Sequence, residues 1–192
     1  MEAQDICPDA GVTGAVSFYY DRPDKIHMAG HKFIWWLGIQ RPISKIESKV
    51  QEIQSVSGCC MLIRKAVIDK IGLLDERFFA YYEESDFCIR AKMAGFKVIS
   101  ARDAKVWHKI NKVLGEGTPK EYYIYTRNQP LFMIKNCHKV FLIIFFILYF
   151  LKVFLRTGGF FVIGKTDISR AILSGFADFF KGNFGEGRLF AK

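Results

Sequence analysis

The sequence lacks the cysteine pattern of a zinc-binding or disulfide-stapled protein. It has five cysteines, an odd number, and no two of them form a CxxC pair. A CxxC pair is the usual start of a zinc knuckle, and regularly spaced, even-numbered cysteines are typical of secreted frameworks. We therefore expect reduced thiols in a cytosolic compartment, several of them buried.

The first residues lack the apolar segment of a secretory signal. "MEAQDICPDAG" is polar and acidic, with no run of apolar residues after its start. A signal peptide needs a positively charged beginning followed by such a run. We therefore expect that this stretch does not direct secretion.

Acidic residues are scarce in the C-terminal part of the chain. Residues 135–192 contain nine basic and three acidic residues, whereas residues 1–134 contain 19 basic and 16 acidic ones. The same C-terminal part is the most apolar of the chain, and this pairing favours an anionic membrane surface as partner. No nucleic-acid-binding motif accompanies the basic excess, so we predict no nucleic-acid partner.

One apolar run dominates the C-terminal part. Val140 to Leu151 is twelve apolar residues, and the run resumes after Lys152 up to Leu155. As a helix these sixteen residues span about 24 Å, which is shorter than the ~30 Å hydrocarbon core of a bilayer. The run is also too apolar on every side for a helix on a water-soluble domain. We expect a membrane-associated helix, then a flexible break at "TGG" and a second small apolar piece.

Residues 167–181 show the spacing of an amphipathic helix. Two interpretations stay open, a helix in the plane of a membrane interface and a helix packed on the domain. The apolar side chains that define its face are Ile168, Ala171, Ile172, Phe176, Phe179 and Phe180.

The remainder of the chain reads as an α/β domain. We expect a turn and then a buried strand within 8–20, a loop over 21–33 and a strand over 55–63. His27 and His31 are four apart, but Pro23 and Gly30 argue against the helix that would make them a metal pair.

Glycines and a capping pattern define the predicted helices. Helices over 65–71 and 83–94 should end at Gly72 and Gly95, and two short strands, "FKVIS" and "AKVWH", should follow on either side of "ARD". Thr118, Pro119 and Glu121 form a helix start, and Pro130 should kink or interrupt that helix.

Three carboxylates stand at the start of the second predicted helix. Asp86 is four residues before Arg90, so we expect a partly exposed ion pair that supports folding, with Glu83 on the same side. Glu84 instead shares a face with Phe87, Cys88 and Ala91, which has no basic residue. A carboxylate beside an apolar face is a candidate for a raised pKa and for general-base catalysis, although a first-turn glutamate facing water is the simpler alternative.

An ordered set of short motifs resembles the second half of the catalytic domain of inverting family 2 glycosyltransferases, especially rhamnosyltransferase-like enzymes. The resemblance covers roughly residues 8–137 and is carried by the order of its pieces. They are "SG" before an apolar strand and Arg64, then "GLLDERFF", "EESDFCIRA", "GFKV", "VWH" and "TRN".

The resemblance implies a GT-A fold, which is an α/β sandwich around a nucleotide-sugar site. It implies that Glu84 is the general base, with Glu83 and Asp86 beside it. Gly58 and Cys59 would line the acceptor side, and His108 would bind the metal, Mg²⁺ or Mn²⁺. Without the resemblance, His108 would be a half-buried histidine at a strand end.

The resemblance also predicts an incomplete fold. The sequence has no Asp-x-Asp, the motif that binds the metal and donor in this family and precedes the matched region. We therefore expect an α/β, incomplete GT-A sandwich that lacks its N-terminal nucleotide-binding half, over 1–137, followed by a membrane-associated helical tail over 138–192. The first half would be another polypeptide, or the frame would be truncated.

The functional hypothesis is transfer of a sugar from a nucleotide-sugar to a hydroxyl of a cell-surface or lipid-linked glycan at the cytoplasmic face of the cell membrane. Whether the chain is itself an enzyme stays open. The alternative is a catalytically inactive, membrane-bound module that binds a glycan or a protein partner.

Overall fold

The computed structural model describes residues 2–109 and 115–187, and the last residues of the predicted tail, 188–192, lie outside this description. Its chain forms two compact units, which we describe separately. The first contains residues up to 34, 40–74 and 83–110, and the second contains 35–39, 75–82 and the chain from 111 onward. The predicted domain boundary at 137/138 falls between two helices of the second unit and stays a prediction.

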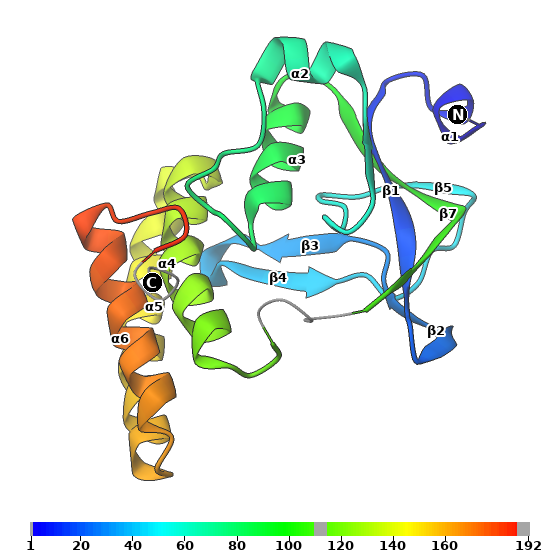
Figure 1. Ribbon diagram of the computed structural model, residues 1–192. Coiled ribbons are helices and arrows are strands. Elements are labelled where there is room, and N and C mark those ends of the chain that lie inside the picture. The colour runs from blue at the N-terminus through cyan, green and yellow to red at the C-terminus, as the bar shows by residue number, and fades with distance from the viewer. Residues whose placement is uncertain (1, 110–114, 188–192) are drawn as a thin grey trace. The chain divides into compact units, whose positions relative to one another are not determined.

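A five-stranded mixed sheet forms the centre of the first unit (Figure 1). Its strand order is β2–β1–β7–β5, and the short β6 also pairs with β1. β1 runs parallel to β7, while the other pairings are antiparallel. The strands are β1 (Ala10–Tyr19), β2 (Arg22–Met28), β5 (Val50–Glu52), β6 (Met61–Ile63) and β7 (Lys97–His108). β3 (His31–Ile34) and β4 (Ile39–Pro42) form a separate two-stranded sheet.

Helix α3 (Glu83–Met93) packs its apolar face on this sheet. Phe87, Cys88 and Ala91 of α3 are buried with Val12 of β1 and Val98 of β7 in one core cluster. The chain also approaches β1 closely at Gly14, where a Cβ atom would lie 2.6 Å from the Val56 side chain. The two other helices of this unit are α1 (Glu2–Ile6) and α2 (Lys65–Ile71), and α2 ends at Gly72 as predicted.

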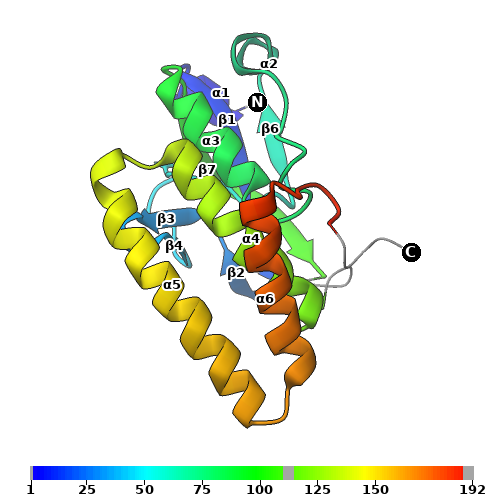
Figure 2. The same cartoon turned by 90° about the vertical axis from the view of Figure 1, so that its left-hand side faces the viewer.

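Three helices make up most of the second unit: α4 (Pro119–Asn136), α5 (Lys139–Val162) and α6 (Thr166–Lys181). Figure 2 shows α5 and α6 as an antiparallel pair. The predicted start of α4 is confirmed, because Glu121 N donates to Thr118 Oγ1 over 3.3 Å. The short 3₁₀ helix η1 (Trp35–Leu37) belongs to the same unit, and Trp35 stacks on Phe132 of α4.

Three predictions for the first unit were wrong. The expected loop over 21–33 contains β2 and β3; Pro23 fits there because β2 is an edge strand and needs no donor on its outer side. The two short strands expected around "ARD" are one strand, β7. Its register against β1 jumps from Ala101 to Lys105, so residues 102–104 bulge out of a continuous pairing. The strand expected over 55–63 is limited to β6, at its end.

The predictions for the helical tail also need correction. α5 continues through Gly158 and Gly159, where a break was expected, because its packing on α6 outweighs the weak helix propensity of glycine. α4 continues through Pro130. Proline has no N–H for the carbonyl four residues earlier, and that carbonyl, Thr126 O, accepts a hydrogen bond of 2.7 Å from the Tyr149 hydroxyl instead.

The structure supports the packed interpretation for part of residues 167–181. Ile168, Ala171 and Ile172 of α6 are buried, and Ala171 joins Tyr123 and Ile124 of α4 in a core cluster. At Gly175 a Cβ atom would lie 2.4 Å from Tyr123 O, so the two helices cross closely. This part of the apolar face of α6 therefore packs on the protein and is not available to a membrane interface.

Candidate functional site

Glu84 lies at the start of α3 and is buried. Its carboxylate accepts a hydrogen bond of 3.2 Å from Ser85 Oγ, and only 8% of the residue is exposed. Burial, followed by repulsion from Glu83, raises the pKa of Glu84 to about 8. The predicted apolar neighbours, Phe87 and Cys88, are buried beside it on α3. The alternative of a first-turn glutamate facing water is therefore wrong.

Glu83 shares this environment but has fewer partners. Burial raises the pKa of its carboxyl, and its Oε2 is buried without a hydrogen-bond partner among the described residues. Two adjacent carboxyls raise one another's pKa values, because charging one of them disfavours charging the other. Such a pair can accept a proton from a bound hydroxyl group.

Gly58, one of the two residues predicted on the acceptor side, lies beside these carboxylates. A Cβ atom on Gly58 would lie 3.4 Å from Glu84 Cβ and 3.8 Å from Glu83 Oε1. A Cβ atom at position 58 would thus make ordinary van der Waals contact with the two glutamates. Cys59 follows, half-buried, with its thiol 3.2 Å from Ser57 Oγ, and burial raises its pKa.

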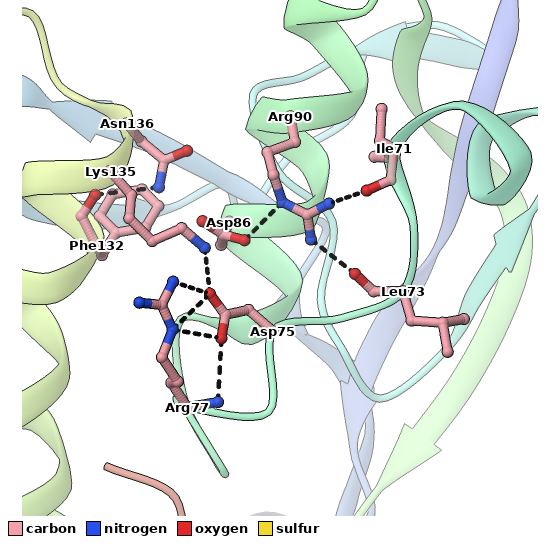
Figure 3. Close-up of polar contacts among 9 residues, drawn as sticks. All are labelled: Ile71, Leu73, Asp75, Arg77, Asp86, Arg90, Phe132, Lys135 and Asn136. Atoms are coloured by element: carbon pink, nitrogen blue, oxygen red, sulfur yellow. Dashed lines mark hydrogen bonds and ion pairs between the residues drawn. The ribbon is translucent and has the colours of Figure 1, made fainter. Parts of the chain in front are cut away.

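Asp86, unlike the two glutamates, has a charged partner among the described residues. This partner is Arg90 (Figure 3). Arg90 Nε donates to Asp86 Oδ2 over 2.8 Å, and the other guanidinium nitrogens of Arg90 donate to the carbonyls of Ile71 and Leu73, each over 2.9 Å. The predicted pair is therefore present, but Asp86 is fully buried instead of partly exposed. Breaking a buried pair leaves an uncompensated charge, so we expect its loss to cost about 3 kcal/mol or more.

His108 lies at the end of β7, in a different environment from these carboxylates. It pairs with Tyr19 of β1, and its ring centroid is 6.1 Å from that of His27. Its Nδ1 is buried and has no hydrogen-bond partner among the described residues. Within residues 2–109 and 115–187, no three His, Cys, Asp or Glu side chains come together as metal ligands. These residues alone therefore do not fit a Mg²⁺ or Mn²⁺ site.

Sequence reasoning missed the serines that surround Glu84. Ser85 Oγ lies 3.1 Å from Ser55 Oγ and accepts a hydrogen bond of 3.2 Å from Gln40 Nε2. Gln40 and Ser55 are distant from α3 in the sequence, and only the fold brings them together. The helical pattern of residues 83–94 gave no signal for this network.

A second missed feature is the strained segment directly before Glu83 in the chain, residues 75–82 of the second unit. Phe79, Tyr81 and Tyr82 have φ values of 61°, 60° and 77°, which bulky residues rarely adopt and which cost about 1–3 kcal/mol each. Asn128 of α4 holds this segment: its Nδ2 lies 2.7, 2.8 and 3.0 Å from the carbonyl oxygens of Phe78, Ala80 and Tyr81. The "TRN" motif contains Asn128, but the sequence did not indicate what it binds.

Asp75 fixes the other end of this segment (Figure 3). It accepts hydrogen bonds from Arg77, with Nη2 at 2.6 Å, and from Lys135 of α4. These two cations hold the pKa of the Asp75 carboxyl well below its usual range. The segment is thus tied to α4 at both ends within the second unit.

Comparison with known proteins supports a coarse assignment. No protein-family model matches the chain. The chain is 34% identical over 62 residues to the low-salt glycan biosynthesis hexosyltransferase Agl10 of Haloferax volcanii, which is 32% of this chain and 20% of that protein. It is 31% identical over 64 residues, 33% of this chain and 21% of the relative, to an N-acetylglucosaminyl-diphospho-decaprenol L-rhamnosyltransferase of Mycobacterium tuberculosis.

The matched region thus spans about a fifth of the length of these curated relatives. Over about a third of its length the chain is similar to glycosyltransferases. The described fold is mixed α/β with one long apolar helix near its C-terminal end.

Proposed function

We propose that the chain forms the acceptor-side part of an inverting glycosyltransferase that moves a sugar from a nucleotide-sugar to a hydroxyl of a cell-surface or lipid-linked glycan. The single observation that carries this proposal is the buried Glu84 carboxylate beside Gly58. Burial raises the pKa of this carboxyl. A general base works best when its pKa is near the working pH. The similarity to two sugar transferases supports the same reaction class.

The residues act as follows in this proposal. The acceptor hydroxyl lies over Gly58 and gives its proton to Glu84 as its oxygen attacks the sugar carbon, and the bond from that carbon to the nucleotide diphosphate breaks. Attack opposite the leaving group inverts the configuration of the carbon. Burial, and then repulsion from Glu83, keep the pKa of Glu84 high, and Asp86 positions α3 through Arg90.

The proposal places only part of the metal site, and not the donor-binding strands, in this chain. The family resemblance implies Mg²⁺ or Mn²⁺, which would steady the leaving diphosphate when bound. His108 would supply one nitrogen ligand, and the other ligands would come from groups outside the described residues. We propose that the GT-A fold is incomplete here, and that the nucleotide-binding strands belong to a further segment or a separate polypeptide.

We further propose that the part from residue 138 onward attaches the protein to the cytoplasmic face of the cell membrane, where nucleotide-sugars and lipid-linked glycans meet. One helix, α5, has the length and composition of a membrane span.

The test compares substitutions of two carboxylate residues, each made in the native gene. Membranes from cells that carry Glu84→Gln, Asp86→Asn or the unchanged gene receive a panel of labelled nucleotide-sugars, and label in the glycan fraction is measured per folded molecule. Glu84→Gln should reduce transfer by roughly 10²–10⁴-fold, because it keeps the shape and removes the base. Asp86→Asn should reduce the amount of folded protein more than the rate.

Two results would contradict the proposal. If Glu84→Gln kept near-normal transfer while folded Asp86→Asn lost it, Glu84 would not be the general base, and the proposal would have named the wrong carboxylate. No transfer from any donor by the unchanged protein, together with retained glycan binding, would favour the inactive membrane-bound binding module. We retain this second candidate function because no cluster of three metal ligands occurs in the described residues.

A further inference from the structure

Helix α5 is long and apolar enough to cross a bilayer by itself. It has 24 residues, most of them are apolar, and only a small share of the helix is buried in the protein. Length and composition do not distinguish a helix that crosses a membrane from one that lies along it. The neighbours of α5 within the second unit do distinguish them.

One side of α5 is bound to charged helices along much of its length. Phe145, Tyr149 and Val153, four residues apart, are buried. The Tyr149 hydroxyl donates to Thr126 O of α4, Lys152 donates to Gln129 Oε1 of α4, and Ser169 Oγ of α6 donates to Thr157 O over 2.9 Å. α5 therefore cannot enter a bilayer alone without breaking these contacts.

The two partner helices are poorly suited to the interior of a bilayer. Of the helices in the described part of the chain, α5 alone is long and apolar enough to cross a membrane. Charged side chains at the centre of a bilayer are strongly disfavoured. α4 carries Lys120, Glu121, Arg127 and Lys135, and α6 carries Asp167, Arg170, Asp178 and Lys181.

The opposite side of α5 presents apolar side chains from one end to the other. Ile143, Ile147, Phe154 and Val162 are 64–83% exposed, and they recur at helical spacing over nearly the whole helix. We call these four residues the α5 stripe. At ~1.5 Å per residue the helix is about 36 Å long, so the stripe is much longer than it is wide.

The charge around the α5 stripe favours an anionic surface. No Asp or Glu occurs from Tyr122 to Thr166, whereas this stretch contains six Lys and Arg residues. Exposed Lys139 and Lys165 stand at the two ends of α5, and exposed Arg156 lies between them. Anionic lipid headgroups would meet these cations while acyl chains cover the stripe.

We propose that α5 lies along, and not across, one face of an anionic membrane, with the α5 stripe in the acyl region and α4 and α6 on its other side. The inference concerns attachment and does not depend on transferase activity.

Two native lysines report the orientation. Sealed vesicles of opposite sidedness, prepared from cells that express the protein, are treated with a membrane-impermeant amine reagent, and labelling of Lys139 and Lys165 is measured by peptide mass spectrometry. Both lysines should react in the same preparation and both should be protected in the other, until detergent opens the vesicles. One lysine reacting in each preparation would mean that α5 crosses the membrane and would overturn the proposal.

A matched pair of variants tests the surface itself. Ile147→Glu places a charge in the α5 stripe and should weaken binding to phosphatidylglycerol vesicles by at least about tenfold. Met93→Glu changes a comparably exposed apolar residue of the first unit and should leave binding unchanged. Equal binding by both variants, or a soluble dimer that does not bind vesicles because a second copy covers the stripe, would contradict the proposal.

Discussion

At the scale of single residues, the raised pKa of Glu84 has a consequence for stability that does not require activity. Folding raises this pKa from 4.5 to about 8, so the folded protein binds one more proton than the unfolded chain between those values. The free energy of unfolding therefore falls as the pH rises through this window, by up to about 1.4 kcal/mol per pH unit, and the contribution of Glu84 levels off above pH 8.

Glu84→Gln should remove this part of the pH dependence and make the protein more stable at pH 8 than the unchanged chain. Denaturant unfolding in mild detergent at pH 5, 6.5 and 8 measures the effect. Lys45→Gln, which alters an exposed cation, should leave the slope unchanged. An unaltered slope in Glu84→Gln would mean that the carboxyl is not buried as described.

Residue-scale predictions from the sequence were good where the contacts are local. The Asp86–Arg90 pair and the Thr118 cap involve residues three or four apart, and both are present. The network of Ser55, Ser85 and Gln40 could not be predicted, because its members come from three separate segments. The positive φ values of Phe79, Tyr81 and Tyr82 were equally hidden, since aromatic residues do not indicate such conformations.

At the scale of elements, the contact between α4 and α5 explains a proline inside a helix. Pro130 leaves Thr126 O without its usual donor, and Tyr149 of α5 supplies one. Tyr149→Phe should therefore leave a buried acceptor unpaired and lower the free energy of unfolding by about 1–3 kcal/mol. The same change in a Pro130→Ala background should cost much less, because an alanine at that position restores the N–H.

A double-mutant cycle of these two positions in thermal unfolding measures the coupling. An equal loss in both backgrounds would show that the Tyr149 hydroxyl does not replace the missing helix donor. From the sequence we expected Pro130 to kink or interrupt the helix. That expectation uses only neighbouring residues, so it could not include a hydrogen-bond donor on another helix. The same limitation explains why Gly158 and Gly159 were expected to break α5.

At the scale of the whole molecule, the distribution of charge and apolar surface predicts how the protein is extracted from cells. High salt screens the contacts of Lys and Arg with lipid, but it does not weaken the burial of apolar side chains. We expect the protein to stay with membranes in 1 M salt (roughly a 3 Å Debye length) and to leave them in detergent. Release by salt alone would mean a purely electrostatic attachment.

The α/β class and the apolar helix near the C-terminal end could be predicted from the sequence, since both depend on the composition of long segments. The assignment of residues 35–39 and 75–82 to the helical unit could not, because these pieces come from between strands and helices of the other unit.

The parallel pairing of β1 with β7 also means that the central part of the sheet cannot form until well after β1 has been synthesised. β1 ends at Tyr19 and β7 begins at Lys97, so the ribosome adds about eighty residues before the long neighbour of β1 exists. At ~5–20 residues per second this takes roughly 4–16 s. The first eight residues of β1 are all buried in the native fold. During that interval, β1 can pair only with its shorter neighbours, β2 and β6. The nascent chain should therefore be held by a chaperone until its β7 segment has left the exit tunnel.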